Sequence, residues 1–353
     1  MKRLSLIVLL VSIIANIASA SVLWNNGAAY TGNWSEIKWY DSGTLTLIAH
    51  PGGEADTRIA TNGVVTVNVS NAQCGLLFLG RGGTPATLNI NSDSAYLLVK
   101  KDSGELVSMS YDDASSGTIN HSAGTLKITR TGGAGTGELR MSHSAYGPQD
   151  VANYNLSGTG LLDVEILSRG DKTSTNAKFN ATGGTLAVQT SIIKWGLVSE
   201  NANYGFKQGG CLLAPDGIGV IGSMLTGNSS NLMDYFMEST SKVKFDLGNG
   251  NPDPSLSSND LITSWGNFTV DGELQVNLMG TYSVGNKWNV WKIESTKIGT
   301  YFGSGAFDIL PPNIQVNWLT GSGAHTLQLE YIPEPTTLVL LGLGGLFAAR
   351  RKK

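Results

Sequence analysis

Apolar and polar residues alternate in short runs along most of the chain. Examples are Val65 to Val69 (VTVNV), Leu162 to Ile166 (LDVEI) and Leu274 to Leu278 (LQVNL). A period of two places apolar side chains on one face of a strand and polar side chains on the other. Glycine pairs such as Gly183-Gly184 separate many of the runs. The pattern predicts an all-β chain, in which only Asn231 to Glu238 reads as a helical turn.

A weak repeat runs through the middle of the chain. Ile119 to Ile128 parallels Phe179 to Val188, Tyr154 to Leu161 follows the same plan with a one-residue slip, and Phe206 to Leu212 is a shortened copy. The copies begin 35, 25 and 27 residues apart. Repeats of this length are typical of solenoids, whose coils share one apolar interior. We expect a right-handed β-solenoid; the alternative is an antiparallel sandwich built from similar hairpins.

The first twenty residues have the layout of a secretory signal peptide. Lys2 and Arg3 precede an apolar run over residues 4–17, and Ala18-Ser19-Ala20 provides the small residues that signal peptidase reads. We expect cleavage after Ala20 and export across the inner membrane. A retained membrane anchor is the alternative.

The C-terminal end also contains an apolar run, but here the basic residues follow the run instead of preceding it. Pro333-Glu334-Pro335 precedes residues 336–349, which carry no charge, and Arg350, Arg351, Lys352 and Lys353 follow. Fourteen helical residues span about 21 Å, against about 30 Å for a hydrocarbon core, so residues before Thr337 would have to extend the span. The basic residues predict a cytoplasmic stop by the positive-inside rule. We therefore expect a transmembrane helix at 336–349.

This arrangement resembles the PEP-CTERM sorting signal of Gram-negative bacteria. The resemblance rests on Pro333-Glu334-Pro335, on the run LVLLGLGGLFAA and on the terminal RRKK. It implies that an exosortase is the partner, that the chain is cut near the PEP motif, and that the body is released to the cell surface or the exopolysaccharide matrix. A related segment is also described as the C-terminal domain of ice-binding proteins. A plain membrane anchor is the alternative.

The body is similar to the autotransporter-passenger-like β-helical repeats of many PEP-CTERM proteins. Phe179 to Val188 and Phe206 to Gly217 carry this similarity, with Asp216 departing from the usual Gly-Gly-x-Leu-x-Pro-Gly. It implies an architecture and no activity. We expect a solenoid over residues 21–225, a β-sandwich-like C-terminal domain over 226–332, and the sorting signal over 333–353, with helices only in the two terminal segments.

Composition narrows the classes of partner. Of 353 residues, 24 are Lys or Arg and 27 are Asp or Glu. Residues 1–20 and 336–353 hold six of the basic residues and no acidic one, so residues 21–335 carry 18 basic against 27 acidic residues, or about −9. A basic footprint for nucleic acid is therefore absent. Cys74 and Cys211 lie 137 residues apart and are expected to be unpaired core residues.

Motifs for catalysis are missing. The four histidines are scattered, and neither a nucleophile elbow nor a P-loop occurs. Asp112-Asp113 would need a turn to converge as a glycosidase pair and reads better as a solvated turn. Asn249, Asn251, Asp253 and Asp260 offer oxygen ligands for calcium without a known spacing, so a polar loop is the preferred interpretation. We predict no catalytic residue, no metal and no cofactor.

Binding surfaces remain as the alternative. Trp24, Trp34 and Trp39 are expected to plug the open end of the solenoid, although tryptophan faces can also stack on sugars. Asn-x-Ser/Thr sites at several turns predict hydrogen-bonded asparagine ladders. The sequence therefore predicts an exported, non-catalytic surface or matrix protein. The alternatives are a carbohydrate- or ice-binding adhesin-like module, with Thr61, Thr66, Thr125 and Thr185 as candidates, and a polysaccharide lyase or hydrolase.

Overall fold

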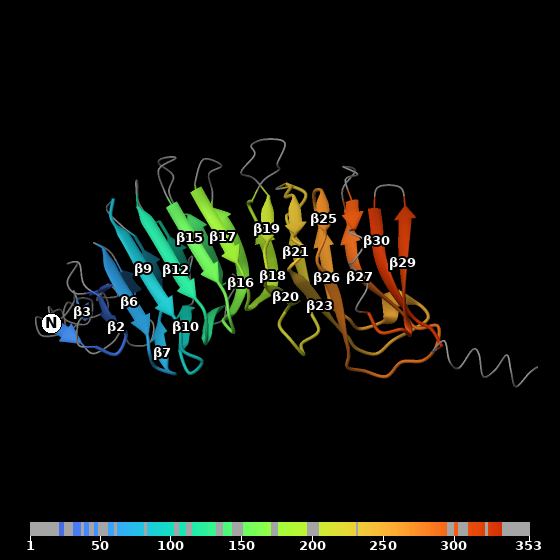
Figure 1. Cartoon of the computed structure of the whole chain (residues 1–353), viewed down its shortest axis with the longest axis horizontal. Coiled ribbons are helices and arrows are strands. Elements are labelled where there is room, and N and C mark those ends of the chain that lie inside the picture. The colour runs from blue at the N-terminus through green and yellow to red at the C-terminus, as the bar shows by residue number, and fades with distance from the viewer. Residues whose placement is uncertain are drawn as a thin grey trace, which may run out of the picture. The chain divides into compact units, whose positions relative to one another are not determined.

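The computed structural model describes residues 21–24, 31–36, 39–41, 46–48, 56–59, 62–80, 83–101, 106–110, 115–131, 137–142, 151–170, 176–195, 205–230, 232–294, 300–302, 310–321 and 324–333. These residues are nearly all in strands and turns, as predicted (Figure 1). They form two compact units: Met1–Asn120 with Gly124–Asn153 and Ser174–Ala177, and His121–Ala123 with Tyr154–Thr173 and Lys178–Lys353. The expected helices at 1–20 and 336–349 lie outside the described residues.

Parallel pairing dominates the first unit. One series of parallel neighbours is β1 (Ser21–Trp24), β5 (Asp56–Ile59), β8 (Leu77–Leu79), β11 (Val107–Met109) and β14 (Glu138–Ser142). A second is β7 (Ala72–Cys74), β10 (Tyr96–Lys101) and β13 (Thr125–Arg130). A third is β2 (Thr31–Asn33), β6 (Gly63–Val67), β9 (Pro85–Ile90) and β12 (Ser116–His121). At the N-terminal end, β3 (Trp39–Asp41) pairs antiparallel with β1 and with β4 (Thr46–Ile48).

The second unit has the same plan. One series is β16 (Leu161–Gly170), β18 (Thr185–Ile193), β20 (Leu212–Pro215), β23 (Lys242–Leu247) and β26 (Glu273–Leu278). From β18 a second series runs through β21 (Ser223–Thr226), β24 (Leu261–Ser264) and β27 (Lys287–Ile293). A third is β19 (Phe206–Gln208), β22 (Tyr235–Met237), β25 (Phe268–Val270) and β28 (Thr300–Phe302). β15 (Val151–Leu156) and β17 (Asn176–Ala181) contribute residues to both units.

The series that contains β27 ends in antiparallel strands. β30 (Ala324–Tyr331) pairs antiparallel with β27 on one side and with β29 (Ile314–Gly321) on the other. Within the described ranges the helical structure is one 3-10 turn, Pro254–Leu256. The expected helical turn at 231–238 is wrong: this segment contains β22, whose partners β19 and β25 fix it as a strand.

The expected sandwich-like segment from residue 226 is also wrong. Parallel pairing continues through β22–β25, β23–β26 and β24–β27, so this region extends the plan that precedes it. The sequence repeat weakens here because the connecting segments lengthen and lose the glycine-pair corner. The division between domains at residues 225 and 226 stays a prediction.

The repeat seen in the sequence has a physical basis in an aromatic stack. Tyr154, Phe179, Phe206 and Tyr235 are all buried, and successive ring centroids lie 5.5, 5.6 and 5.7 Å apart. This spacing is close to the separation of neighbouring strands, about 4.7–4.9 Å. The bulky residue that begins each copy is therefore the one whose side chain packs, inside the core, on its counterpart in the neighbouring strand.

The glycine of the repeat is required by close backbone approach. Gly184 has a φ of +79°, and a Cβ there would lie 2.6 Å from the carbonyl oxygen of Gly160. Gly124, at the same place in another copy, has a φ of +74°. Both the left-handed backbone and the neighbouring strand exclude a side chain, so a glycine recurs at this corner.

Asparagine ladders form on the outside, as predicted. The Asn120 side-chain amide donates to Asn89 Oδ1 at 2.9 Å, and that of Asn180 donates to Asn155 Oδ1 at 2.9 Å. In each pair the two residues lie on different strands. The sequon residues Asn120, Asn155 and Asn180 therefore have a structural role as hydrogen-bonding partners between strands.

Candidate functional site

The C-terminal segment leaves the body from a strand that is held on both sides. β30 lies between β27 and β29 and ends at Tyr331, two residues before Pro333. Leu327 and Leu329 point into the core, where Trp288 of β27 is fully buried. Because both edges of β30 are paired, the exit point of the chain is fixed.

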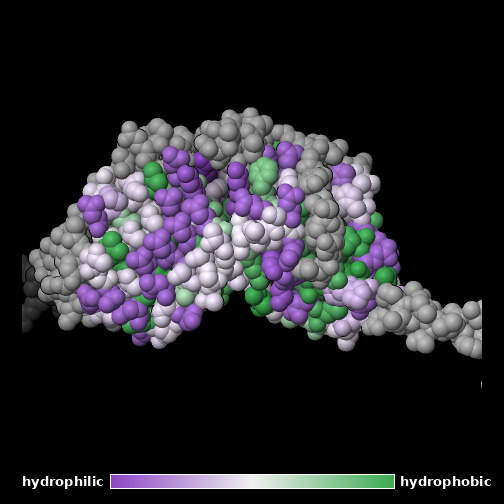
Figure 2. All heavy atoms as spheres, viewed as in Figure 1, coloured by the Kyte–Doolittle hydropathy of each residue, from purple (hydrophilic) through white to green (hydrophobic). Residues whose placement is uncertain are grey.

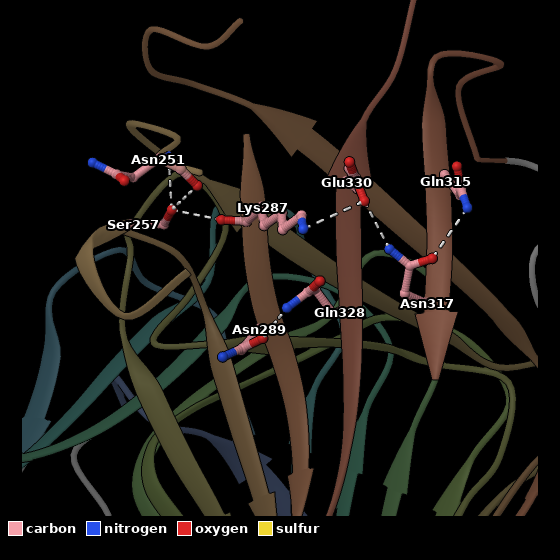
Figure 3. Close-up of polar contacts among 8 residues, drawn as sticks. All are labelled: Asn251, Ser257, Lys287, Asn289, Gln315, Asn317, Gln328 and Glu330. Carbon is pink, nitrogen blue, oxygen red and sulfur yellow. Dashed lines mark hydrogen bonds and ion pairs between the residues drawn. The ribbon is translucent and has the colours of Figure 1, made fainter. Parts of the chain in front are cut away.

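A row of polar side chains ties the three strands together on their outer side (Figure 3). Asn317 Nδ2 donates to Glu330 Oε2 at 3.0 Å, and Lys287 Nζ lies 3.9 Å from the same oxygen. Gln328 donates to Asn289 Oδ1 at 3.0 Å. These contacts cross from β29 to β30 and from β30 to β27, so they support the register that positions the exit.

Backbone hydrogen bonds continue to hold the chain at the end of β30 and one residue beyond it. The amide of Gly285 donates to the carbonyl of Tyr331 at 2.8 Å, and the amide of Tyr331 donates to the carbonyl of Asn286 at 2.9 Å. The amide of Ile332 donates to Asn313 at 2.8 Å. The rings of Tyr282 and Tyr331 lie 4.8 Å apart. The chain is thus anchored to its neighbours up to the residue before Pro333.

Pro333 is the one residue of the predicted sorting motif that the structure describes. Glu334, Pro335 and the basic residues Arg350, Arg351, Lys352 and Lys353 lie outside the described residues, as do Ala18 and Ala20 of the signal-peptidase site. Asp112 and Asp113 also lie outside them. Among the described residues no helix is long and apolar enough to cross a membrane.

The side chains of the candidate calcium loop accept hydrogen bonds from backbone amides of the loop itself and of the neighbouring connection. Asp253 caps the 3-10 turn by accepting from the amide of Ser255 at 2.9 Å. Asn251 Oδ1 accepts from the amide of Asp253, and Asn249 Oδ1 from that of Thr281 at 3.0 Å. No cluster of three metal-ligating acids, histidines or cysteines occurs in the part of the chain that the structure describes. The side chains of Asn249, Asn251 and Asp253 are therefore engaged in hydrogen bonds with the backbone, and calcium binding stays untested.

The burial of two carboxylates at this loop, those of Asp246 and of the calcium candidate Asp260, was not anticipated. Asp260 accepts from the amides of Gly222 at 2.9 Å and Asp246 at 2.7 Å, and burial raises its pKa to about 7. Asp246 accepts from the amide of Gly219 at 2.6 Å and from Asn277 Nδ2 at 2.6 Å. Both carboxylates thus hold the connection that precedes β21. The pairing of segments distant in sequence creates this arrangement, so no local pattern announced it.

The predicted binding residues do not converge. Thr66 lies between Asn33 and Asn89, Thr125 pairs with Tyr96, and Thr185 pairs with Leu161 and Leu212, so these threonines form no row. Thr61 lies outside the described residues.

Of the three tryptophans expected to plug the open end, the structure describes the side chain of Trp34, which lies in the core as Trp288 and Trp291 do. Trp34, Trp288 and Trp291 are fully buried, and the Trp291 indole donates to Ser264 Oγ at 2.7 Å. They therefore present no flat face to a sugar. Nothing is described of the side chains of Trp24 and Trp39.

Cys74 and Cys211 are buried free thiols, as expected. Burial raises the pKa of each to about 12, so neither is a thiolate at neutral pH. Both act as small core residues.

Comparison with known families gives one match, at the exit of the body. Residues 332–353 match the family described as the PEP-CTERM protein-sorting motif. No curated protein matches the chain. The match begins one residue after β30 ends and covers the PEP triad, the apolar run and the basic end. It implies export, anchoring at the C-terminal segment followed by release, and an exosortase as the processing partner. The chain therefore carries a PEP-CTERM sorting motif joined directly to a clamped terminal strand.

Proposed function

We propose that this chain is an exported, non-catalytic protein of the cell surface or exopolysaccharide matrix of a Gram-negative bacterium. The sorting motif at residues 332–353 carries the proposal. An exosortase cuts near Pro333-Glu334-Pro335 and releases the body, while signal peptidase has removed residues 1–20. The inner membrane holds the chain only between these two events.

The body in this proposal is a right-handed β-solenoid. Support comes from parallel neighbours 20 to 38 residues apart in sequence, with Thr57 and Leu77 at the short limit and Ser223 and Leu261 at the long one. Ladders of like residues, asparagine outside and aromatic inside, are typical of stacked coils. A passive role follows from a long polar surface that can make many weak contacts with matrix polysaccharide.

The test is a sorting experiment in the native host with Glu334→Ala. We expect the wild-type body to appear outside the cell, with a mass that begins near Ser21 and ends near Pro335. The variant should accumulate uncut in the inner membrane, because the exosortase no longer recognises its motif.

Glu238→Ala is the matched control, since it makes the same change at an exposed glutamate that lies outside both the motif and the strands that hold β30. It should be released like the wild type. Release of Glu334→Ala at the wild-type level, with the same C-terminal residue, would refute processing at the PEP motif.

A further inference from the structure

Three connections in the second unit lie one above another along one edge. They join β20 to β21 (residues 216–222), β23 to β24 (248–260) and β26 to β27 (279–286). β20, β23 and β26 are parallel neighbours, and so are β21, β24 and β27. Earlier in the unit, the single strand β18 pairs with both β20 and β21, so no connection separates the two series there. The three connections therefore lie toward the end of the unit that leads to β30.

These connections carry most of the exposed large hydrophobic side chains. Of the nine such residues that the described part of the chain exposes, seven lie here: Ile218, Val220, Ile221, Leu256, Met279, Tyr282 and Val284. Leu256 is 69% exposed and Val284 is 59% exposed. Hydrophobic surface interrupts the polar surface along the lower edge of this unit (Figure 2). We call these seven residues the apolar loop face.

The three connections carry few charged residues, which favours an apolar partner over a charged one. They contain no Lys or Arg, and their acidic residues are Asp216, Asp253 and the buried Asp260. The remaining positions are glycine, serine, asparagine, threonine and proline. Such a surface has no basic side chain that could bind an anionic group. Its apolar side chains can instead enter the boundary between lipid headgroups and acyl chains.

The apolar loop face is held in place by the body. Buried Asp246 and Asp260 accept from the amides of Gly219 and Gly222, on either side of Val220 and Ile221. Asn249 accepts from the amide and hydroxyl of Thr281 at 3.0 and 3.1 Å and so joins the second connection to the third. Hydrophobic side chains that are exposed on a fixed backbone mark an interaction surface more than a frayed loop.

The sorting segment leaves the body beside this face. Gly285 and Asn286 of the third connection bond to Tyr331, and the Tyr282 ring contacts the Tyr331 ring. The apolar run begins at Thr336, five residues after Tyr331. Five residues reach at most about 17–18 Å when fully extended. While that run is in the membrane, the third connection is therefore confined close to the membrane surface.

We propose that the apolar loop face rests on the lipid surface of the membrane while the chain is anchored, and that it orients the PEP bond there. This inference rests on the membrane anchoring in the proposed function. A short tether gives the face a high effective concentration at the lipid, so a weak contact suffices before cleavage. Cutting the tether removes that advantage, which lets the same face leave the membrane.

The test uses the full-length chain in phosphatidylcholine vesicles with an environment-sensitive NBD label on single introduced cysteines. Val220→Cys, Leu256→Cys and Val284→Cys report on the face, Leu341→Cys reports on the tail, and Leu319→Cys is the matched control. Leu319 is 46% exposed but pairs with Thr326 on β30, five positions from Tyr331. Native Cys74 and Cys211 are buried, and the wild type treated with the label corrects for any background.

We expect nitroxide-labelled lipid to lower the emission of the three face labels roughly twofold, because the face would enter about 5–10 Å into the headgroup boundary. The tail label should also be quenched, and the Leu319→Cys label should not. The face signal should be unchanged by salt, since no basic residue contributes.

The failures are distinguishable. A quenched tail label with unquenched face labels overturns this inference and leaves the sorting proposal standing. An unquenched tail label overturns the anchoring and, with it, the inference. Face labels that become shielded only as the protein density rises would mean that a second copy covers the face, and the lipid contact would be wrong.

Discussion

The aromatic stack can be tested by truncating its central ring. Phe206 is fully buried between Phe179 at 5.6 Å and Tyr235 at 5.7 Å, with Trp195 at 5.2 Å in an edge-to-face arrangement. Phe206→Ala leaves a cavity lined by these three rings. Core Phe→Ala changes cost about 3–5 kcal/mol in total, and this total already includes the aromatic pairs that are lost. We expect a loss of about 4 kcal/mol in the free energy of unfolding.

Phe236→Ala is the matched control. Phe236 lies in β22, next to Tyr235, and its side chain is only partly buried. Removing the same ring from the outer side should cost about 1 kcal/mol, because roughly half as much apolar area is withdrawn from water. The contrast between the two variants separates burial in the stack from loss of a phenylalanine as such.

Urea unfolding of the full-length chain in mild detergent measures both effects. Tryptophan fluorescence follows the transition, and hydrogen exchange of the β19 and β22 amides shows whether the loss is local. A double-mutant cycle of Phe179→Leu and Phe206→Leu should give a coupling of about 0.5–1.5 kcal/mol. A cost for Phe206→Ala equal to that of Phe236→Ala, or a coupling of zero, would refute the stack as the source of the repeat.

Three further predictions concern titratable side chains. Burial raises the pKa of Asp260 to about 7. Its contribution to stability is therefore greatest below the unfolded pKa near 4 and is lost as pH rises through 7. Chemical denaturation should show a lower free energy of unfolding at pH 8 than at pH 5, and Asp260→Asn should reduce this difference. An equal difference in the variant would contradict this. Cys74 and Cys211 should react with a thiol reagent at pH 8 only after urea unfolding, because their pKa values are raised to about 12; rapid reaction of the native chain would show that they are accessible. Glu330→Gln should cost less than about 1 kcal/mol in urea unfolding, since the Lys287 pair is long and partly exposed; a loss above 2 kcal/mol would show that this network is stronger than its geometry indicates.

The stacked core was predictable because its requirements are local. Each copy needs a bulky residue to fill the interior and a glycine where two backbones meet, and Phe179 and Gly184 meet both. Residues 231–238 were misread because apolar residues at 232, 233, 235, 236 and 237 fit a helical turn as well as a strand. Parallel pairing with β19 and β25 decides in favour of the strand, and no eight-residue window contains that information.

The region after residue 226 was misread for a related reason. Its connections at 248–260 and 279–286 vary in length and composition, so the spacing that marks a repeat is lost although the strand pairing persists. The same variation hid the buried pair Asp246 and Asp260, which lie at the two ends of the 248–260 connection and accept from the amides of Gly219 and Gly222 in the preceding one. The sorting motif, in contrast, is contiguous and could be read directly at Pro333 to Lys353.

The position of the sorting motif follows from how a parallel stack must end. A last parallel strand presents unpaired backbone groups to any neighbouring chain, and this edge favours aggregation wherever chains are concentrated. Here β27 is covered by β30, which runs antiparallel and is itself covered by β29. The strand that closes the stack is also the strand that leads into the sorting motif. Docking of the last strands therefore fixes the point at which the chain enters the sorting motif.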